Sequence, residues 1–173
     1  MKKLLLLLIV LTVTISCNTE KARKQVDSFR KAKSEKTINE VLDTWHKAAA
    51  DANFDTYFSK MTDDAIFIGT DATENWKNED FKAFSKPYFD KGKAWSFTAL
   101  ERNVFISEYD DIAWFDELLD TQMELCRGSG VLKKVGDTWK ISHYVLSIAI
   151  PNDNVPEVIK LKKENDSILK SAY

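Results

Sequence analysis

Residues 125–150 constrain the fold of this chain more than any other stretch. Two runs rich in β-branched and aromatic residues flank the pair Gly136-Asp137, and such a pair between such runs is typical of the tight turn in a β-hairpin. With the turn at this pair, Gly130 faces His143 across the two strands. A strand face that sets two glycines opposite a histidine leaves empty volume beside a titratable group. The hairpin therefore predicts either the wall of a pocket or a bulged and bent strand.

This hairpin completes a series of four strands in the second half of the chain. We expect them at residues 95–107, 111–119, 123–135 and 138–150. In the first strand the apolar residues around Phe97 and those around Ile106 fall on opposite parities. A bulge near residues 100–102 would bring both sets to one face, and long bent strands are typical of a strongly curved sheet.

The first half of the chain is mainly helical. Thr37 and Glu40 form a capping box in front of a helix that ends near Ala50. Three further elements are a short helix capped by Asn53, a buried strand at residues 65–68 and a helix at residues 81–91. This order predicts an α+β domain at residues 37–151, with its helices on the concave side of one curved antiparallel sheet. A C-terminal amphipathic helix or tail follows at residues 152–173.

The N-terminus has the pattern of an exported protein. Two lysines precede an apolar run at residues 4–15, which has the length of a signal peptide and is short for a membrane span. The run ends at Thr14-Ile15-Ser16-Cys17, which resembles the cleavage box of bacterial lipoproteins. That resemblance implies removal of residues 1–16 and lipidation of Cys17; the alternative is an ordinary signal peptide with an incidental cysteine. Polar residues 17–36 then predict a tether, so we expect a cell-envelope protein that contacts the membrane through its lipid anchor only.

Composition excludes several classes of function. A formal net charge of −2 offers no bulk attraction for nucleic acid, so no nucleic-acid partner is expected. With two histidines and two cysteines, neither a histidine-rich metal site nor a cysteine-based zinc site can form. The chain also lacks the glycine-rich nucleotide loops and the zinc-protease and serine-hydrolase motifs. We therefore expect no metal and no cofactor, although carboxylates could still hold a hard cation.

Four strings in the chain carry a family resemblance when they are taken in order. They are Ile66-Phe67-Ile68-Gly69-Thr70-Asp71 with Trp76, Ala113-Trp114-Phe115-Asp116-Glu117, Arg127-Gly128-Ser129-Gly130-Val131-Leu132, and Trp139-Lys140-Ile141 with His143. Together they resemble the SnoaL-like branch of the nuclear transport factor 2 superfamily. The resemblance implies a cone-shaped sheet wrapped on helices, with a pocket inside and often a dimer through the outer sheet face. Because the superfamily includes isomerases, dehydratases, epoxide hydrolases, polyketide cyclases and non-catalytic domains, it does not choose between enzyme and binding protein.

The resemblance also implies where proton-transfer chemistry would occur. Enzymes of this superfamily commonly use an Asp, sometimes with a His, in an apolar pocket, and the candidates here are Asp116, Glu117 and His143. If the turn after them is Asp120-Thr121, Glu117 shares a face with His143 and Asp116 points away; a slip of one residue reverses this. The alternative is a solvated carboxylate and a hydrogen-bonded core histidine, so no catalytic residue is assigned.

Candidate ligand-binding residues follow from the same strings. They comprise three aromatic side chains for the pocket wall and two polar ones, namely Trp76, Trp95, Trp114, His143 and Arg127. Arg127 either holds a ligand carboxylate in a bidentate fork or pairs with acidic residues on the outer sheet face, which the hairpin register favours. His46 and Cys126 receive no functional role, as a helix-surface histidine and a small buried residue.

The interpretation favoured by these patterns is a lipid-anchored envelope protein that holds a small, largely apolar molecule and forms a homodimer through the outer sheet face. One alternative is a cofactor-free isomerase, dehydratase or hydrolase that uses an Asp/Glu–His pair. A second alternative is a dimeric interaction module without a working pocket.

Overall fold

The computed structural model describes the backbone of residues 2–173 and the side chains of residues 20–173. Cys17 and the signal segment at residues 1–16 lie outside the described side chains. The helices are α1 (Lys2–Ala50), α2 (Phe54–Ser59), α3 (Asn78–Asp90) and α4 (Val155–Lys170), with a 3-10 turn at Asn152–Asn154. The strands are β1 (Met61–Ile68), β2 (Asn75–Lys77), β3 (Phe97–Ile106), β4 (Ile112–Thr121), β5 (Glu124–Val135) and β6 (Thr138–Ile148).

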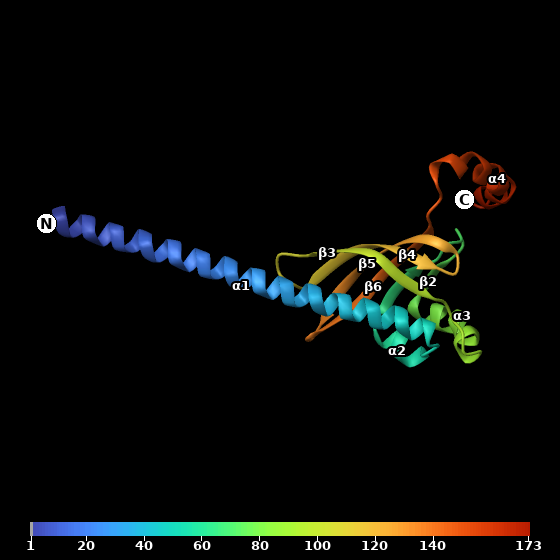
Figure 1. Cartoon of the computed structure of the whole chain (residues 1–173), viewed down its shortest axis with the longest axis horizontal. Coiled ribbons are helices and arrows are strands. Elements are labelled where there is room, and N and C mark those ends of the chain that lie inside the picture. Colours follow the sequence, from blue (N-terminus) through green and yellow to red (C-terminus); the bar gives the residue numbers. More distant parts are fainter. Residues whose placement is uncertain (1) are drawn as a thin grey trace.

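The six strands form one curved sheet in the order β2-β1-β6-β5-β4-β3. Neighbouring strands are antiparallel except for β1 and β6, which are parallel. The C-terminal part of α1 lies across one face of the sheet, with α2 and α3 beside its end (Figure 1). Apolar residues of α1, such as Leu42 and Trp45, are buried against this face. The predicted α+β class and curved sheet are confirmed.

The β5–β6 hairpin turns where the sequence predicts but has a different register beyond its middle. Val135 pairs with Thr138 around the Gly136-Asp137 turn, and Gly136 has a φ of +60°, which suits glycine. After Leu132 pairs with Ile141, the register shifts by one residue. Ser142 is the extra residue, as expected of a bulge in a sharply curved strand. The bulge reverses which face the later residues of β6 occupy.

This bulge overturns the predicted pairing of Gly130 with His143. Gly130 pairs with Tyr144, whereas His143 pairs with Val131 on the outer face. Tyr144 is fully buried and fills the space that the glycines leave: a Cβ added to Gly128 would lie 2.3 Å from the Tyr144 hydroxyl. The volume predicted as a pocket wall is therefore occupied by a side chain of the protein.

Two other register predictions have different outcomes. The bulge predicted in the third strand region is confirmed, because the β3–β4 register shifts between Ala99 and Glu101. The β4–β5 turn lies at Gln122-Met123, since Thr121 pairs with Glu124, so the assumed turn at Asp120-Thr121 is wrong. The correct turn is two residues later, and it preserves the alternation that points Glu117 inward.

Helix α1 is longer than the sequence analysis predicts. Thr37 lies inside the helix, where its hydroxyl donates a hydrogen bond to the carbonyl of Lys33 (3.1 Å), so the predicted helix start at a capping box is wrong. Residues 18–36 contain neither glycine nor proline and are rich in Lys, Glu, Arg and Ala, which favour helix. In the described part of the chain, no helix is both long and apolar enough to span a membrane.

The C-terminal helix α4 stands apart from the sheet (Figure 1). It begins with Pro156 in its first turn, as the sequence predicts, and has no buried residue along its length. Between α4 and the loop that joins β1 to β2 lies an open groove, whose walls include Asp71, Glu74 and Lys162. The helix therefore contributes little to the core of the domain.

Candidate functional site

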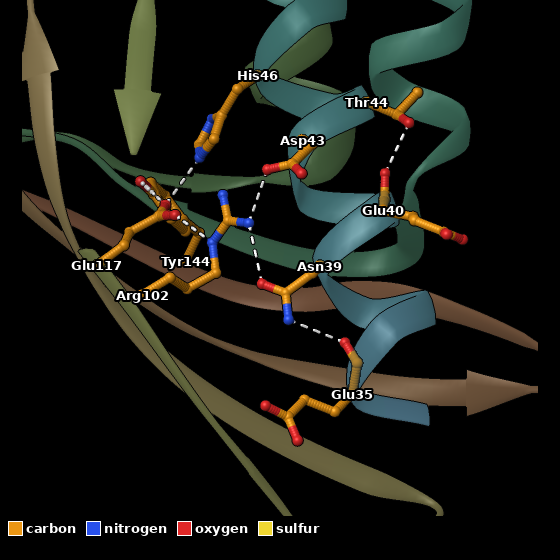
Figure 2. A network of polar contacts seen from close by, with 9 residues as sticks. All are labelled: Glu35, Asn39, Glu40, Asp43, Thr44, His46, Arg102, Glu117 and Tyr144. Atoms are coloured by element: carbon orange, nitrogen blue, oxygen red, sulfur yellow. Dashed lines mark hydrogen bonds and ion pairs between the residues drawn. The ribbon is translucent and has the colours of Figure 1, made fainter. Parts of the chain in front are cut away.

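A polar network occupies the inside of the cone, and Glu117 is its centre (Figure 2). Glu117 has 0 % exposure, and its carboxylate accepts three hydrogen bonds. Nε2 of His46 lies 2.8 Å from Oε1, the hydroxyl of Tyr144 donates to the same oxygen at 3.1 Å, and Nε of Arg102 donates to Oε2 at 2.9 Å. Both carboxylate oxygens are thus engaged by protein side chains.

Each member of the network comes from a different element. Glu117 points inward from β4 because residues of alternate parity face opposite sides of a sheet, and it pairs with Arg102 in β3. Opposite Glu117 in β5 is Gly128, whose missing side chain leaves space for the carboxylate and for Tyr144 from β6. His46 reaches down from α1 (Figure 2).

Arg102 also ties the helix to the sheet. Its Nη1 donates to the side-chain oxygen of Asn39 at 3.2 Å and to the carboxylate of Asp43 at 2.7 Å, both on α1. The Arg102 side chain is almost fully buried. A charge-assisted network of this kind is costly to leave incomplete, because each buried charge depends on the others for its hydrogen bonds.

The partners of Glu117 keep it ionised. Burial alone would raise the pKa of Glu117, but the hydrogen bond and charge of His46 and the charge of Arg102 outweigh burial and lower this pKa below its usual value. Burial and the adjacent negative charge raise the pKa of Tyr144 well above its usual value, so Tyr144 is a neutral donor. Glu117 is therefore an acceptor that orients His46 and Tyr144, and it does not hold a proton to donate at neutral pH.

Of the three predicted acid–base candidates, only Glu117 lies inside the sheet. Glu117 does lie inside next to a histidine, but that histidine is His46, and His143 lies on the outer face because of the bulge at Ser142. Asp116 also faces outward, where its carboxylate lies 3.6 Å from the Arg127 guanidinium. The sequence contains a signal for His46, since it follows Leu42 by one helical turn on the buried stripe of α1.

The predicted ligand-binding residues are divided between the two faces and the edge of the sheet. Trp76 stacks on Phe84 near the sheet edge, with ring centroids 4.9 Å apart. Trp114 stacks on Phe105 on the outer face and is 49 % exposed, and Arg127 lies on that face as well. These positions exclude Trp114, Arg127 and His143 from the interior, whereas Trp95 and Trp76 are partly buried and pack against the core.

Trp95 forms one wall of a small cavity at the mouth of the cone. The cavity measures about 130 Å³ and is lined by Ala50, Lys93, Ala94, Trp95, Ser96 and Gln122. On the other side of Trp95 lies Tyr57, with ring centroids 5.5 Å apart. Burial raises the pKa of Tyr57, against a smaller lowering by the Trp95 indole, and the Tyr57 hydroxyl makes no hydrogen bond of ordinary geometry. Tyr57 is therefore a buried donor without a hydrogen-bond partner, and it is not among the residues that line the cavity.

The interior of the cone is otherwise well filled. Aromatic rings of Trp45, Tyr57, Phe81 and Phe89 pack against one another and against Trp95. Among the residues that the structure describes, no group of three His, Cys, Asp or Glu side chains is arranged to hold a metal ion. Cys126 is buried and not disulfide-bonded. The cavity beside Trp95, which opens at the surface, and the buried Glu117 network are thus two candidate functional sites.

Comparisons with known proteins identify the domain. Residues 38–151 match the SnoaL-like domain family. No curated protein matches the chain. An NTF2-like protein of unknown function from Pseudomonas putida KT2440 is 14 % identical with a TM-score of 0.61, and the match covers 71 % of this chain and 92 % of that one. An NTF2-like protein from Cytophaga hutchinsonii is 16 % identical with a TM-score of 0.57, over 66 % and 98 % of the two chains.

A third solved structure carries an enzyme description. It comes from Novosphingobium aromaticivorans, is assigned provisionally as a scytalone dehydratase, and is 10 % identical with a TM-score of 0.62 over 71 % of this chain and 89 % of that one. Identities this low establish a shared fold and carry no activity from one protein to another.

Proposed function

The chain belongs to the SnoaL-like domain family, and from this premise we propose that it is a lipid-anchored protein of the cell envelope that binds a small, largely apolar molecule at the mouth of its cone. The observation that carries this proposal is the cavity of about 130 Å³ beside Trp95. A concave site with an aromatic wall and a few polar groups is the usual form of a small-molecule site.

The lining of the cavity indicates what the ligand looks like. Ala50, Ala94 and the Trp95 ring offer apolar surface, while Lys93 and Gln122 lie at the rim. The Lys93 ammonium and the Gln122 side-chain amide are hydrogen-bond donors at this rim. A small apolar ligand with one hydrogen-bond acceptor, such as a carbonyl oxygen, fits this set of groups.

Native mass spectrometry of the protein purified from its own host tests this proposal. We expect a retained small molecule that is lost in Ala94→Leu, whose larger side chain fills the cavity, and that is kept in Ala32→Leu, an exposed position on α1. A molecule retained equally by both variants would place the binding site elsewhere. Absence of any bound molecule in the unaltered protein, together with no thermal shift from apolar carbonyl compounds, would contradict the proposal.

A second candidate function is cofactor-free proton transfer, and the Glu117–His46 pair favours it. A carboxylate 2.8 Å from a histidine nitrogen is the arrangement that orients a histidine as a general base. The test uses whatever compound is recovered from the host: turnover should vanish in His46→Gln and persist in His143→Gln. Turnover that survives in His46→Gln would end the enzymatic alternative.

The anchoring part of the proposal rests on the N-terminal sequence. An apolar run ends at a small residue followed directly by Cys17. We expect labelled palmitate to be incorporated into the unaltered protein and not into Cys17→Ala. Incorporation that persists in this variant would contradict anchoring at this cysteine.

We also propose that two copies associate through the outer face of the sheet. Cross-strand pairing sets Phe105, Trp114, Val131 and His143 side by side in one row across β3, β4, β5 and β6. Phe105 and Trp114 are large apolar residues on an exposed surface, where such a row is typical of an interaction site.

A further inference from the structure

The part of α1 that precedes the domain, residues 20–36, has two unlike sides; we call it the stalk. Because an α-helix has 3.6 residues per turn, Ala22, Val26, Phe29 and Lys33 lie along one side, at spacings of four, three and four residues. Val26 is 66 % exposed and Phe29 74 % exposed. Two large apolar side chains thus face solvent on an otherwise charged helix.

Charges on the stalk are divided between the two sides. All three acidic residues of the stalk, Glu20, Asp27 and Glu35, lie on the side opposite Phe29. The Phe29 side carries Lys33 and Lys36, and its flank carries Lys21. We call this combination of Val26, Phe29 and the three lysines the basic face. None of the acidic residues of the stalk lies on it.

Contacts with the domain fix which way the basic face points. Ser34 is buried, and Nη2 of Arg30 donates to the carbonyl of Glu108 at 3.1 Å, in the turn between β3 and β4. Around the helix axis, Arg30 lies about 100° and Ser34 about 140° from Phe29. Phe29 therefore does not face the domain, whereas Lys33, at the edge of the basic face, lines a groove that it shares with Asp110 and Asp137. The stalk projects beyond the sheet (Figure 1).

We propose that the stalk binds an anionic lipid surface through its basic face. A helix with exposed apolar side chains flanked by cations, and with its acidic residues on the far side, is complementary to a bilayer that carries negatively charged headgroups. The stalk is then not a spacer that holds the domain away from the membrane. It is a second attachment that orients the domain with the helix between the sheet and the lipid.

This inference adds to the proposed lipid anchor and can be separated from it. A single lipid chain gives weak, reversible attachment, and a basic segment is the usual second signal. An anchor acts on any bilayer, whereas the basic face responds to headgroup charge and to salt. Attachment to neutral vesicles tests the anchor, and the change caused by anionic lipid tests the stalk.

The experiment compares the full chain on vesicles of phosphatidylcholine alone and of phosphatidylcholine with phosphatidylglycerol. Hydrogen exchange of the amides of residues 20–36 is read by mass spectrometry at low and high salt. Phosphatidylglycerol should slow this exchange at low salt only. The affinity for the anionic vesicles, read from this slowing, should fall by roughly fivefold for each lysine removed from the basic face. The test variant is Lys33→Gln with Lys36→Gln, and a second variant, Phe29→Ser, removes the apolar contact.

A matched control removes two charges from the other side of the same helix. Lys24→Gln with Lys31→Gln changes the net charge of the stalk equally but leaves the basic face intact, so its exchange should still slow on anionic vesicles. Equal exchange on both vesicle types, or an equal loss in the two double variants, would overturn the proposal. Slowing that depends on protein density and not on lipid charge would assign the face to a second copy of the chain and would also overturn it.

Discussion

Asp116 and Glu117 are consecutive residues of β4 with the same functional group, yet they differ in direction, exposure and hydrogen bonding. Glu117 points inward, has 0 % exposure and accepts three hydrogen bonds. Asp116 points outward, where its contacts with Arg127 at 3.6 Å and Asn103 at 3.3 Å are long and solvated. The comparison teaches that the face of the sheet, and not the type of residue, decides whether a carboxylate organises the core.

The two histidines of the chain repeat this contrast. His46 is buried against Glu117, and His143 lies on the outer face beside Val131. The predicted partner of the inner carboxylate, His143, is wrong, because the bulge at Ser142 in β6 turns His143 to the outer face. The inner and outer faces of the sheet can therefore be distinguished by matched variants.

The largest expected difference is between Glu117→Gln and Asp116→Asn. Loss of the inner carboxylate leaves Arg102 and His46 without their buried acceptor, and breaking a buried pair costs about 3–5 kcal/mol of unfolding free energy. The outer variant should change this free energy by less than about 0.5 kcal/mol, since exposed ion pairs contribute little. Urea unfolding followed by circular dichroism measures both. Equal losses would show that Glu117 is not the centre of the core network.

Neighbouring residues of β5 provide the next comparison. A Cβ on Gly128 would lie 2.3 Å from the Tyr144 hydroxyl and 3.0 Å from Glu117, so Gly128→Ala should cost about 1–3 kcal/mol by overpacking. Ser129 lies on the outer face, and Ser129→Ala should be within about 0.5 kcal/mol of the unaltered protein. Thermal unfolding of the two variants tests whether Tyr144 occupies the space that the glycine leaves.

Acid titration should reveal the ionised state of Glu117. The pKa of Glu117 is lower in the folded protein than in the unfolded chain, so its charge stabilises the fold above the ordinary pKa of a glutamate, about 4.3. This contribution is lost as the pH falls toward the lowered pKa. The difference in unfolding free energy between the unaltered protein and Glu117→Gln should therefore shrink as the pH falls. A difference that grows toward acid would mean that the folded-state pKa is raised.

A large exposed residue of the outer face is expected to matter more for association than for stability. Trp114→Ser removes a side chain that is 49 % exposed and should change the unfolding free energy by less than about 1 kcal/mol. Its effect should appear instead in association, because the row that includes Phe105 loses its largest member. Analytical ultracentrifugation should show a dimer for the unaltered protein and a shift toward monomer for the variant. A monomer in both would contradict the proposed dimer.

Most of the fold could be predicted from local patterns. The Gly136-Asp137 turn, the Asn53 helix cap and the bulge near Leu100 are each encoded by a few neighbouring residues. The inward position of Glu117 was one of two alternatives for β4, and the assumed turn gave the right face because it is wrong by two residues, which leaves the parity unchanged. Such features need no knowledge of what lies across the sheet.

The rest depended on tertiary packing. The bulge at Ser142 reverses the face of every later residue in β6, and one inserted residue is enough to move His143 outward and Tyr144 inward. Its trace in the sequence is a change of apolar parity between Ile141 and Tyr144, which has meaning only once the curved sheet is known. Likewise, the capping signal at Thr37 was overridden because the residues before it continue the helix.

The parallel pairing of β1 with β6 also determines when this domain can complete its fold. Residue 61 pairs with residue 141, and residue 67 with residue 144, so the first strand finds its partner only after nearly the whole domain has been made. Contacts this distant in sequence make folding slow, because the chain entropy is lost before the contact forms. In an emerging chain, β1 therefore lacks its β6 partner until the last hairpin has been made. The residues that close the sheet thus also set how long the nascent chain depends on protection from aggregation.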